Sequence, residues 1–290
     1  MARTTESVTS KIVTIVVAVV LSTASLFLLW YGGGQQLVTA SHGAGLRISA
    51  LGTVLAIVGI LLICAVAVTA RVTVIGVAVA GTATALFGII VLVSQDSSLS
   101  IIQFFRPISS QLVVGSGLWM IHGFVFALGI VVLAVAAVAR LSRTTSRKSA
   151  ISALRGPLAI VLAIVAAVVG LDFLSSNDLQ HIVIGAVLLG AVVLSGIIAR
   201  AAPMIAGTVL TVTGLLGFFF EPAARSMART VGFLGNGATA GLHVAFGVGF
   251  VATFGAILLA TTIVVRSSGR RESSVAPHGY GVETVYKGEH

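Results

Sequence analysis

The sequence predicts an all-α fold: a polytopic membrane helix bundle in which eight transmembrane helices form two parallel four-helix repeats. Three observations lead to this prediction: the composition, the lengths of the apolar runs and a likeness between the two halves of the chain. Hydrophobic residues fill 57% of the 290 positions and charged residues only 9%, with a mean hydropathy of +1.13. Soluble domains carry about 25% charged residues, so this composition excludes an ordinary soluble domain.

Eight apolar runs are close to the length of about 20 residues that crosses the hydrocarbon core as a helix. They lack the alternation of apolar and polar residues that is typical of outer-membrane strands. The first run could belong to a signal peptide cleaved after Val38-Thr39-Ala40, but it is too long and ends at Trp30 and Tyr31 like an anchored span. The predicted spans are residues 12–30, 48–70, 72–93, 118–139, 157–174, 181–199, 203–220 and 242–265.

The positions of the charges predict the orientation of these spans. The net charge of +9 would suggest nucleic-acid binding in a soluble protein. However, all but four of the 17 basic residues fall on one side of the spans, the exceptions being Arg47, Arg106, Arg225 and Arg229. Basic residues concentrate on the cytoplasmic side, where anionic lipid attracts them. We therefore expect a multi-pass protein of a bacterial cytoplasmic membrane with both termini in the cytoplasm, and no nucleic-acid partner.

The two halves of the chain share several features in the same order, which predicts an internal duplication. Gly81 and Gly88 in the third span correspond to Gly207 and Gly214 in the seventh, and Phe-Phe-Arg-Pro at 104–107 corresponds to Phe-Phe-Glu-Pro at 219–222. Each copy has an even number of spans, so both copies enter the membrane in the same direction. The predicted units are a first repeat over 1–139, a basic cytoplasmic linker over 140–156, a second repeat over 157–266 and a disordered cytoplasmic tail over 267–290.

Local features predict further details. The segment 99–107 is too apolar for a solvated loop, so we expect a short interfacial helix there, and Gly32-Gly33-Gly34 is expected to form a turn at the outer end of a helix. Glycines at helix-packing intervals favour close helix contacts, with a ligand cavity or helix breaks as the alternative. Asp172 is the ionisable residue nearest to a span centre, and we expect headgroup water to reach it near the outer end of its span.

Candidate site residues are few. No catalytic motif is present, and Cys64, the single cysteine, allows no internal disulfide and no CxxC motif. Imidazole is a common metal ligand, but no histidine of the outer side is followed by a second ligand at i+3 or i+4, so we predict no metal or cofactor. Arg106 and Glu221 occupy equivalent Phe-Phe-X-Pro positions with opposite charge and are a possible inter-repeat ion pair. The histidines that a metal site would use are His42, His122, His181 and His243.

The second half carries a family resemblance. Asn177-Asp-Leu-Gln-His181-Ile-Val-Ile-Gly185, followed by paired glycine-rich helices and a final span, resembles a four-helix integral membrane family of actinobacteria whose function is uncharacterised. The start of the second span in the first half, Ile48-Ser49-Ala50-Leu51, lacks both the Asn and the His. The resemblance implies a tandem duplicate of that unit and supplies no activity.

These observations predict a protein without catalytic activity that serves as an accessory or scaffold subunit, with membrane lipid and other membrane protein subunits as its partners. One alternative is a permease or binding protein for an apolar solute or lipid, held between the two halves. A second alternative is a haem or metal protein that uses the outer-face histidines.

Overall fold

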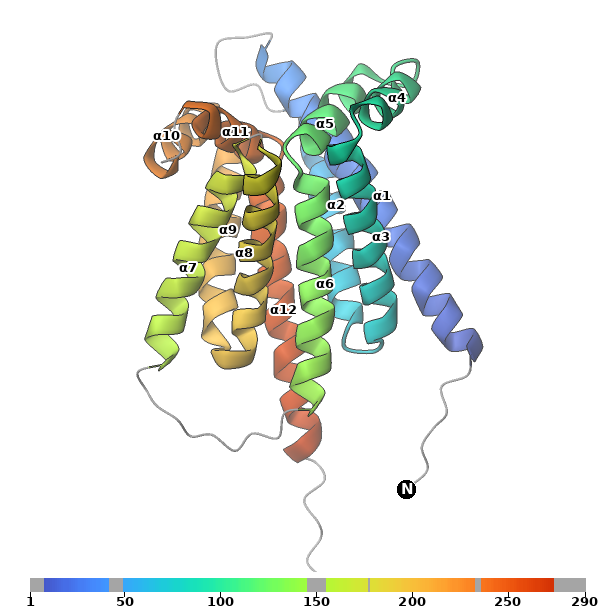
Figure 1. Cartoon of the computed structure of the whole chain (residues 1–290), viewed down its shortest axis with the longest axis vertical. Coiled ribbons are helices and arrows are strands. Elements are labelled where there is room, and N and C mark those ends of the chain that lie inside the picture. The colour runs from blue at the N-terminus through green and yellow to red at the C-terminus, as the bar shows by residue number, and fades with distance from the viewer. Residues whose placement is uncertain (1–7, 42–48, 145–154, 177, 233–235, 274–290) are drawn as a thin grey trace, which may run out of the picture.

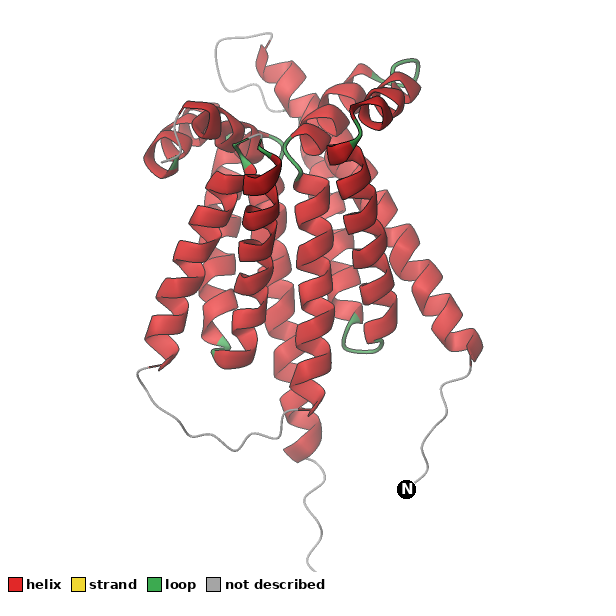
Figure 2. Cartoon of the chain, in the orientation of Figure 1, coloured by secondary structure: helices red, strands yellow, loops and turns green. Residues whose placement is uncertain are grey.

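The computed structural model describes residues 8–41, 49–144, 155–176, 178–232 and 236–273. Helices make up nearly all of these residues, and no strand occurs among them (Figure 2), which confirms the all-α prediction. The helices are α1 (Val8–Ser41), α2 (Ala50–Thr69), α3 (Val74–Val93), α4 (Gln95–Phe105), α5 (Ser110–Ile121), α6 (Phe124–Thr144), α7 (Arg155–Leu174), α8 (Leu179–Ile198), α9 (Ala201–Phe219), α10 (Glu221–Val231), α11 (Asn236–Gly247) and α12 (Phe250–Ser273).

Seven of the described helices, α1, α2, α3, α6, α7, α8 and α9, are long and apolar enough to cross a membrane. The pair α11 and α12 passes the same test as one span with a bend of 66°. The multi-pass helical class predicted from the apolar runs is therefore confirmed, with seven candidate spans among the described residues, or eight if the bent pair counts as one span.

The helices α6 and α12 occupy the centre of the bundle, with α1 to α3 on one side and α7 to α9 on the other (Figure 1). Helix α6 packs on α3 and on α8, while α12 packs on α9 and on α2, so each central helix joins the two halves. The first residues of α1 and α7 and the last residues of α6 and α12 lie at one end of the bundle, called here the inner end. Helices α4, α5, α10 and α11 lie at the opposite, outer end.

Glycines allow the closest helix contacts of the bundle. A Cβ atom on Gly88 of α3 would overlap the backbone of Phe126 in α6, and one on Gly214 of α9 would overlap the backbone of Ala252 in α12. Helices gain little hydrophobic free energy by associating within lipid, so van der Waals contacts between closely packed backbones stabilise the bundle instead. The prediction of glycine-mediated packing is confirmed at these contacts.

The spans predicted over 118–139 and 242–265 are not continuous helices, and this part of the prediction was wrong. Helix α5 ends at Ile121 and α6 begins at Phe124, while α11 ends at Gly247 and α12 begins at Phe250. Gly123 and Gly249 sit in these breaks with φ of 67° and 78°. Glycine adopts such left-handed conformations without the steric cost that a Cβ atom brings, so the chain can change direction here.

Gly32, Gly33 and Gly34 belong to α1 and do not form the predicted turn. Successive residues of a helix point about 100° apart, so three glycines in a row leave room on three faces. Gly32 lies against Ala56 of α2, Gly33 against Val248 of the second break and Gly34 against Gln111 of α5. The triplet lets three neighbours approach α1 without interrupting it.

The predicted boundaries need three adjustments. A helix does cover most of the 99–107 segment, as expected, but it is α4, which ends at Phe105, and the separate helix α5 that follows was not predicted. Helices α6 and α7 extend into the predicted linker, which leaves 145–154 outside the described residues. Helix α12 continues to Ser273, so residues 267–273 are helical, because extending an existing helix costs far less than starting one. The rest of the predicted tail, 274–290, lies outside the described residues.

Candidate functional site

An apolar pocket of about 550 Å³ lies in the first half, between α1, α3 and α4. Small-molecule pockets commonly measure roughly 300–1,000 Å³ and are lined mostly by apolar and aromatic side chains. The lining residues are Val19, Ser22, Thr23, Leu26, Phe27 and Trp30 of α1, Ala83, Thr84 and Phe87 of α3, and Ser100, Ile101, Phe104 and Phe105 of α4.

Four aromatic rings form the end of the pocket where α1 meets α4. Phe27, Trp30 and Phe105 contact one another edge to face, with ring centroids 5.5–6.0 Å apart, and Phe104 packs on Phe105 at 5.5 Å. Trp30 and Phe105 are buried, whereas Phe104 is 67% exposed. The buried rings therefore fix α4 on α1, and the exposed ring forms part of the rim.

Three of the four hydroxyl-bearing residues of the pocket wall donate to their own helices. Ser22 Oγ and Thr23 Oγ1 each donate to the carbonyl of Val19 at 2.9 Å, and Ser100 Oγ donates to the carbonyl of Asp96 at 2.7 Å. Their hydrogens are thus occupied, and the wall presents itself to a ligand as mainly apolar. The indole N–H of Trp30 differs, because it is buried and has no acceptor in the described part of the chain.

The pocket is bounded toward the inner end by direct contact between α1 and α3. A Cβ atom on Gly76 of α3 would lie 2.9 Å from the carbonyl oxygen of Thr14 in α1. Toward the outer end, α3 carries the small side chains of Ala83 and Thr84, which leave space between α3 and α1. The cavity therefore extends from the middle of the bundle to α4 at the outer end.

The histidines predicted as possible ligands lie apart. His122 ends α5, is buried and stacks on Phe124 at 5.4 Å, and His181 stacks on Phe173 with its Nδ1 2.9 Å from Asp178 Oδ2. Within the described residues no three His, Cys, Asp or Glu side chains form a group that could hold a metal ion. His42 lies outside the described residues.

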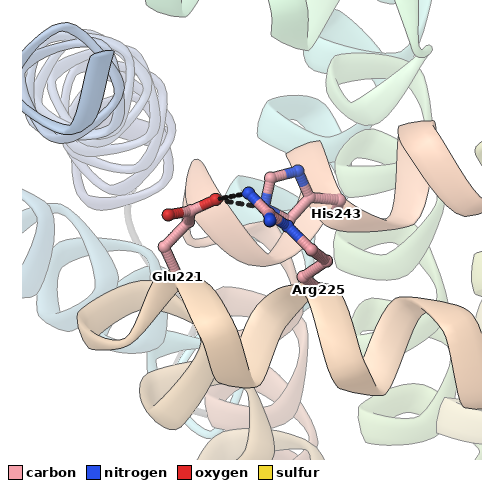
Figure 3. A network of polar contacts seen from close by, with 3 residues as sticks. All are labelled: Glu221, Arg225 and His243. Atoms are coloured by element: carbon pink, nitrogen blue, oxygen red, sulfur yellow. Dashed lines mark hydrogen bonds and ion pairs between the residues drawn. The ribbon is translucent and has the colours of Figure 1, made fainter. Parts of the chain in front are cut away.

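The predicted pairing of Arg106 with Glu221 does not form. Glu221 accepts a hydrogen bond from Arg225, one turn further along α10, and its Oε1 lies 3.9 Å from Nε2 of His243 in α11 (Figure 3). Arg106 lies at the end of α4 in the other half (Figure 1), and no ion pair joins it to Glu221 among the described residues. Arg225 lies at i+4 on the same helix, so it can pair with Glu221 without any approach of the two halves, and Glu221 therefore pairs locally.

The environment of Asp172 also differs from the one predicted. Its side chain is fully buried within the bundle and is not exposed to headgroup water, although it lies near the outer end of α7. Ser175, the next residue on that face, is fully buried as well, and its hydroxyl donates to the carbonyl of Leu171 at 2.8 Å. This buried polar position lies in the second half, away from the residues that line the apolar pocket.

Sequence reasoning found only part of the pocket. The apolar character of 99–107 indicated that Phe104 and Phe105 do not face free solvent, and both line the pocket. Trp30, Ala83 and Thr84 gave no functional signal, because aromatic and small residues are common in membrane helices. The predicted position for an apolar ligand, between the halves, differs from this pocket within the first half.

The fold and the pocket define the class as a multi-pass α-helical membrane protein with an apolar cavity among its spans. No model of a known protein family matches the chain, and no curated protein or solved structure gave a match either. The resemblance to the actinobacterial four-helix family therefore stays a prediction.

Proposed function

We propose that this protein binds a membrane lipid by an acyl chain in the pocket between α1, α3 and α4, and that it does so without chemical conversion of the lipid. The observation that carries the proposal is the pocket itself, with a volume of about 550 Å³ and an aromatic and aliphatic wall. None of its lining residues is a histidine, a cysteine, a carboxylate or a cation, so the wall offers no acid–base pair for catalysis.

The surroundings of the pocket support a lipid as the occupant. Val20 on α1 and Leu86 on α3, next to lining residues, are 58% and 56% exposed, as expected of side chains that face hydrocarbon. Phe27 and Phe104 on the rim are exposed aromatic residues, which favour the interfacial region of a bilayer. A lipid can therefore reach the cavity by lateral movement within the membrane.

We further infer a bacterial cytoplasmic membrane with both termini in the cytoplasm, which places the pocket in the outer leaflet. Basic residues at the inner end, among them Arg71, Arg140 and Arg143, support this orientation. We also infer a tandem duplication, supported by Gly123 and Gly249 occupying equivalent helix breaks.

The test is to purify the full chain in mild detergent and to quantify retained lipid by native mass spectrometry. Ala83→Phe places a ring in the pocket from an exposed position of α3, and we expect retained lipid to fall at least severalfold. Thr82→Phe is the matched control, because Thr82 is also exposed on α3 but does not line the pocket. Equal lipid retention by both variants would refute the proposed function.

A role as an accessory or scaffold subunit remains the second candidate function, and the same purification tests it. A partner subunit retained in stable proportion, together with unchanged lipid content in the Ala83→Phe variant, would favour the scaffold over the lipid-binding function.

A further inference from the structure

We propose that the ligand of the pocket is an anionic glycerophospholipid, whose ester carbonyl accepts a hydrogen bond from Trp30 and whose phosphate lies at Arg106. This inference rests on the proposed lipid-binding function and names the lipid class. It is carried by two groups where α1 meets α4: a neutral donor, Trp30, which lines the pocket, and a cation, Arg106, which directly follows the lining residue Phe105.

The first group is the indole N–H of Trp30. A buried indole usually finds a hydrogen-bond acceptor, because leaving the donor unpaired away from water is costly. Two buried indole N–H groups, those of Trp30 and Trp119, have no acceptor in the described part of the chain, and only Trp30 lines the pocket. The lining hydroxyls of Ser22 and Thr23 donate to their own helix, so they do not compete for an acceptor on the ligand.

The second group is the guanidinium of Arg106. Arg106 caps the C-terminal end of α4 directly after Phe105, whose ring contacts Trp30 with centroids 6.0 Å apart. Consecutive Cα atoms are about 3.8 Å apart, so the backbone of Arg106 lies next to that of the lining residue Phe105, although Arg106 itself is not part of the pocket wall. Arg106 is exposed and forms no ion pair with the described residues, whereas Arg225 of α10 is paired with Glu221.

The chemistry of a glycerophospholipid matches this order of groups. Its acyl chain is apolar, its ester carbonyl is an acceptor at the top of the chain, and its phosphate follows a few bonds further on. The pocket has an apolar wall, and where α1 meets α4 this wall includes Trp30, whose N–H has no acceptor among the described residues, with the cation Arg106 directly after the lining residue Phe105. A fatty acid or a neutral apolar solute would use only part of this arrangement.

Purified full-length protein, stripped of lipid in detergent, tests the proposal by native mass spectrometry with added phosphatidylglycerol or phosphatidylcholine of equal chain length. We expect phosphatidylglycerol to bind roughly fivefold more tightly, the effect of one cation near an anionic headgroup. Arg106→Gln should remove this preference, while Arg229→Gln, which changes an exposed outer arginine of α10, should retain it.

A second comparison uses ester-linked and ether-linked phosphatidylglycerol, because the ether lipid lacks the carbonyl acceptor. We expect the ester form to bind roughly two- to tenfold more tightly to the unmodified protein, and Trp30→Phe to abolish the difference. The comparison within the unmodified protein holds even where Trp30→Phe impairs folding.

The outcomes separate this inference from the function on which it rests. Equal binding of the two headgroups, loss of preference in both arginine variants, or equal binding of ester and ether lipids would overturn the inference while lipid binding itself stands. If Ala83→Phe leaves binding of every lipid unchanged, the pocket is not the lipid site and both proposals fail.

Discussion

At the scale of single residues, Gly115 determines how closely α5 can approach α1. A Cβ atom at this position would overlap the carbonyl oxygen of Trp30, which belongs to the backbone and cannot rotate away. Gly117, in the same helix, has only Ile102 Cδ1 near its would-be Cβ, at an ordinary contact distance of 3.6 Å. Two glycines two positions apart therefore have different structural roles.

We predict that Gly115→Ala destabilises the protein by about 3 kcal/mol, because forcing atoms into a closely packed contact costs roughly 1–3 kcal/mol or more. Gly117→Ala should be neutral or slightly stabilising, because alanine is favoured over glycine in helices by about 1 kcal/mol. Thermal unfolding of the purified variants in detergent measures both. Similar melting temperatures for the two variants would contradict the assigned contact.

These glycines also show what sequence can and cannot predict at this scale. Their spacing indicates close helix packing in lipid, and that prediction is confirmed at Gly88 and Gly214. The sequence does not say which glycine meets a backbone atom and which meets the flexible end of a side chain, since that depends on the neighbouring helix. For the same reason Ala83 and Thr84 could not be recognised as pocket residues.

At the scale of elements, Arg143 joins the end of α6 to the turn between α2 and α3. Its Nη2 atom donates hydrogen bonds to the carbonyl of Ala70 at 2.8 Å and to that of Arg71 at 3.0 Å. Carbonyls at the C-terminal end of a helix have no intrahelical donor, so an arginine can satisfy them. This contact holds the inner end of the first half together.

Arg143→Ala should lower the free energy of unfolding by about 1 kcal/mol, a value reduced from that of a buried charged hydrogen bond because the arginine is exposed. Arg140→Ala is the control, as Arg140 is an exposed arginine one turn earlier on the same helix. Chemical unfolding in mixed detergent compares the two variants. An equal loss in the two variants would show that net charge, and not the contact, matters at this end.

The helix breaks mark the limit of sequence reasoning for elements. Apart from His122, the residues next to Gly123 and Gly249 are apolar on both sides, so hydropathy predicts a single span across each break. What divides them is the positive φ of one residue, a backbone property to which hydropathy is insensitive. The shorter helices α5 and α11 could therefore not be separated from α6 and α12 in advance, although the existence and the type of the spans could.

At the scale of the whole molecule, the charge pattern and the arrangement of helices agree on one geometry. The described ends of α1, α6, α7 and α12 meet at the inner end, and α4 and α10 both lie at the outer end (Figure 1). Each half therefore runs through the bundle in the same direction, as the even number of predicted spans requires. Which end faces the cytoplasm depends on the distribution of basic residues.

This orientation predicts the labelling of single cysteines placed on the two ends in a Cys64→Ser background. Gln103→Cys on α4 and Ser226→Cys on α10 are exposed positions of the outer end, one in each half, and Thr9→Cys is an exposed position of the inner end. In intact cells a membrane-impermeant maleimide should label the two outer cysteines and should reach the inner one only after permeabilisation. Labelling of only one outer cysteine would show that the halves have opposite orientations, and labelling of the inner one alone would reverse the topology and place the pocket in the cytoplasmic leaflet.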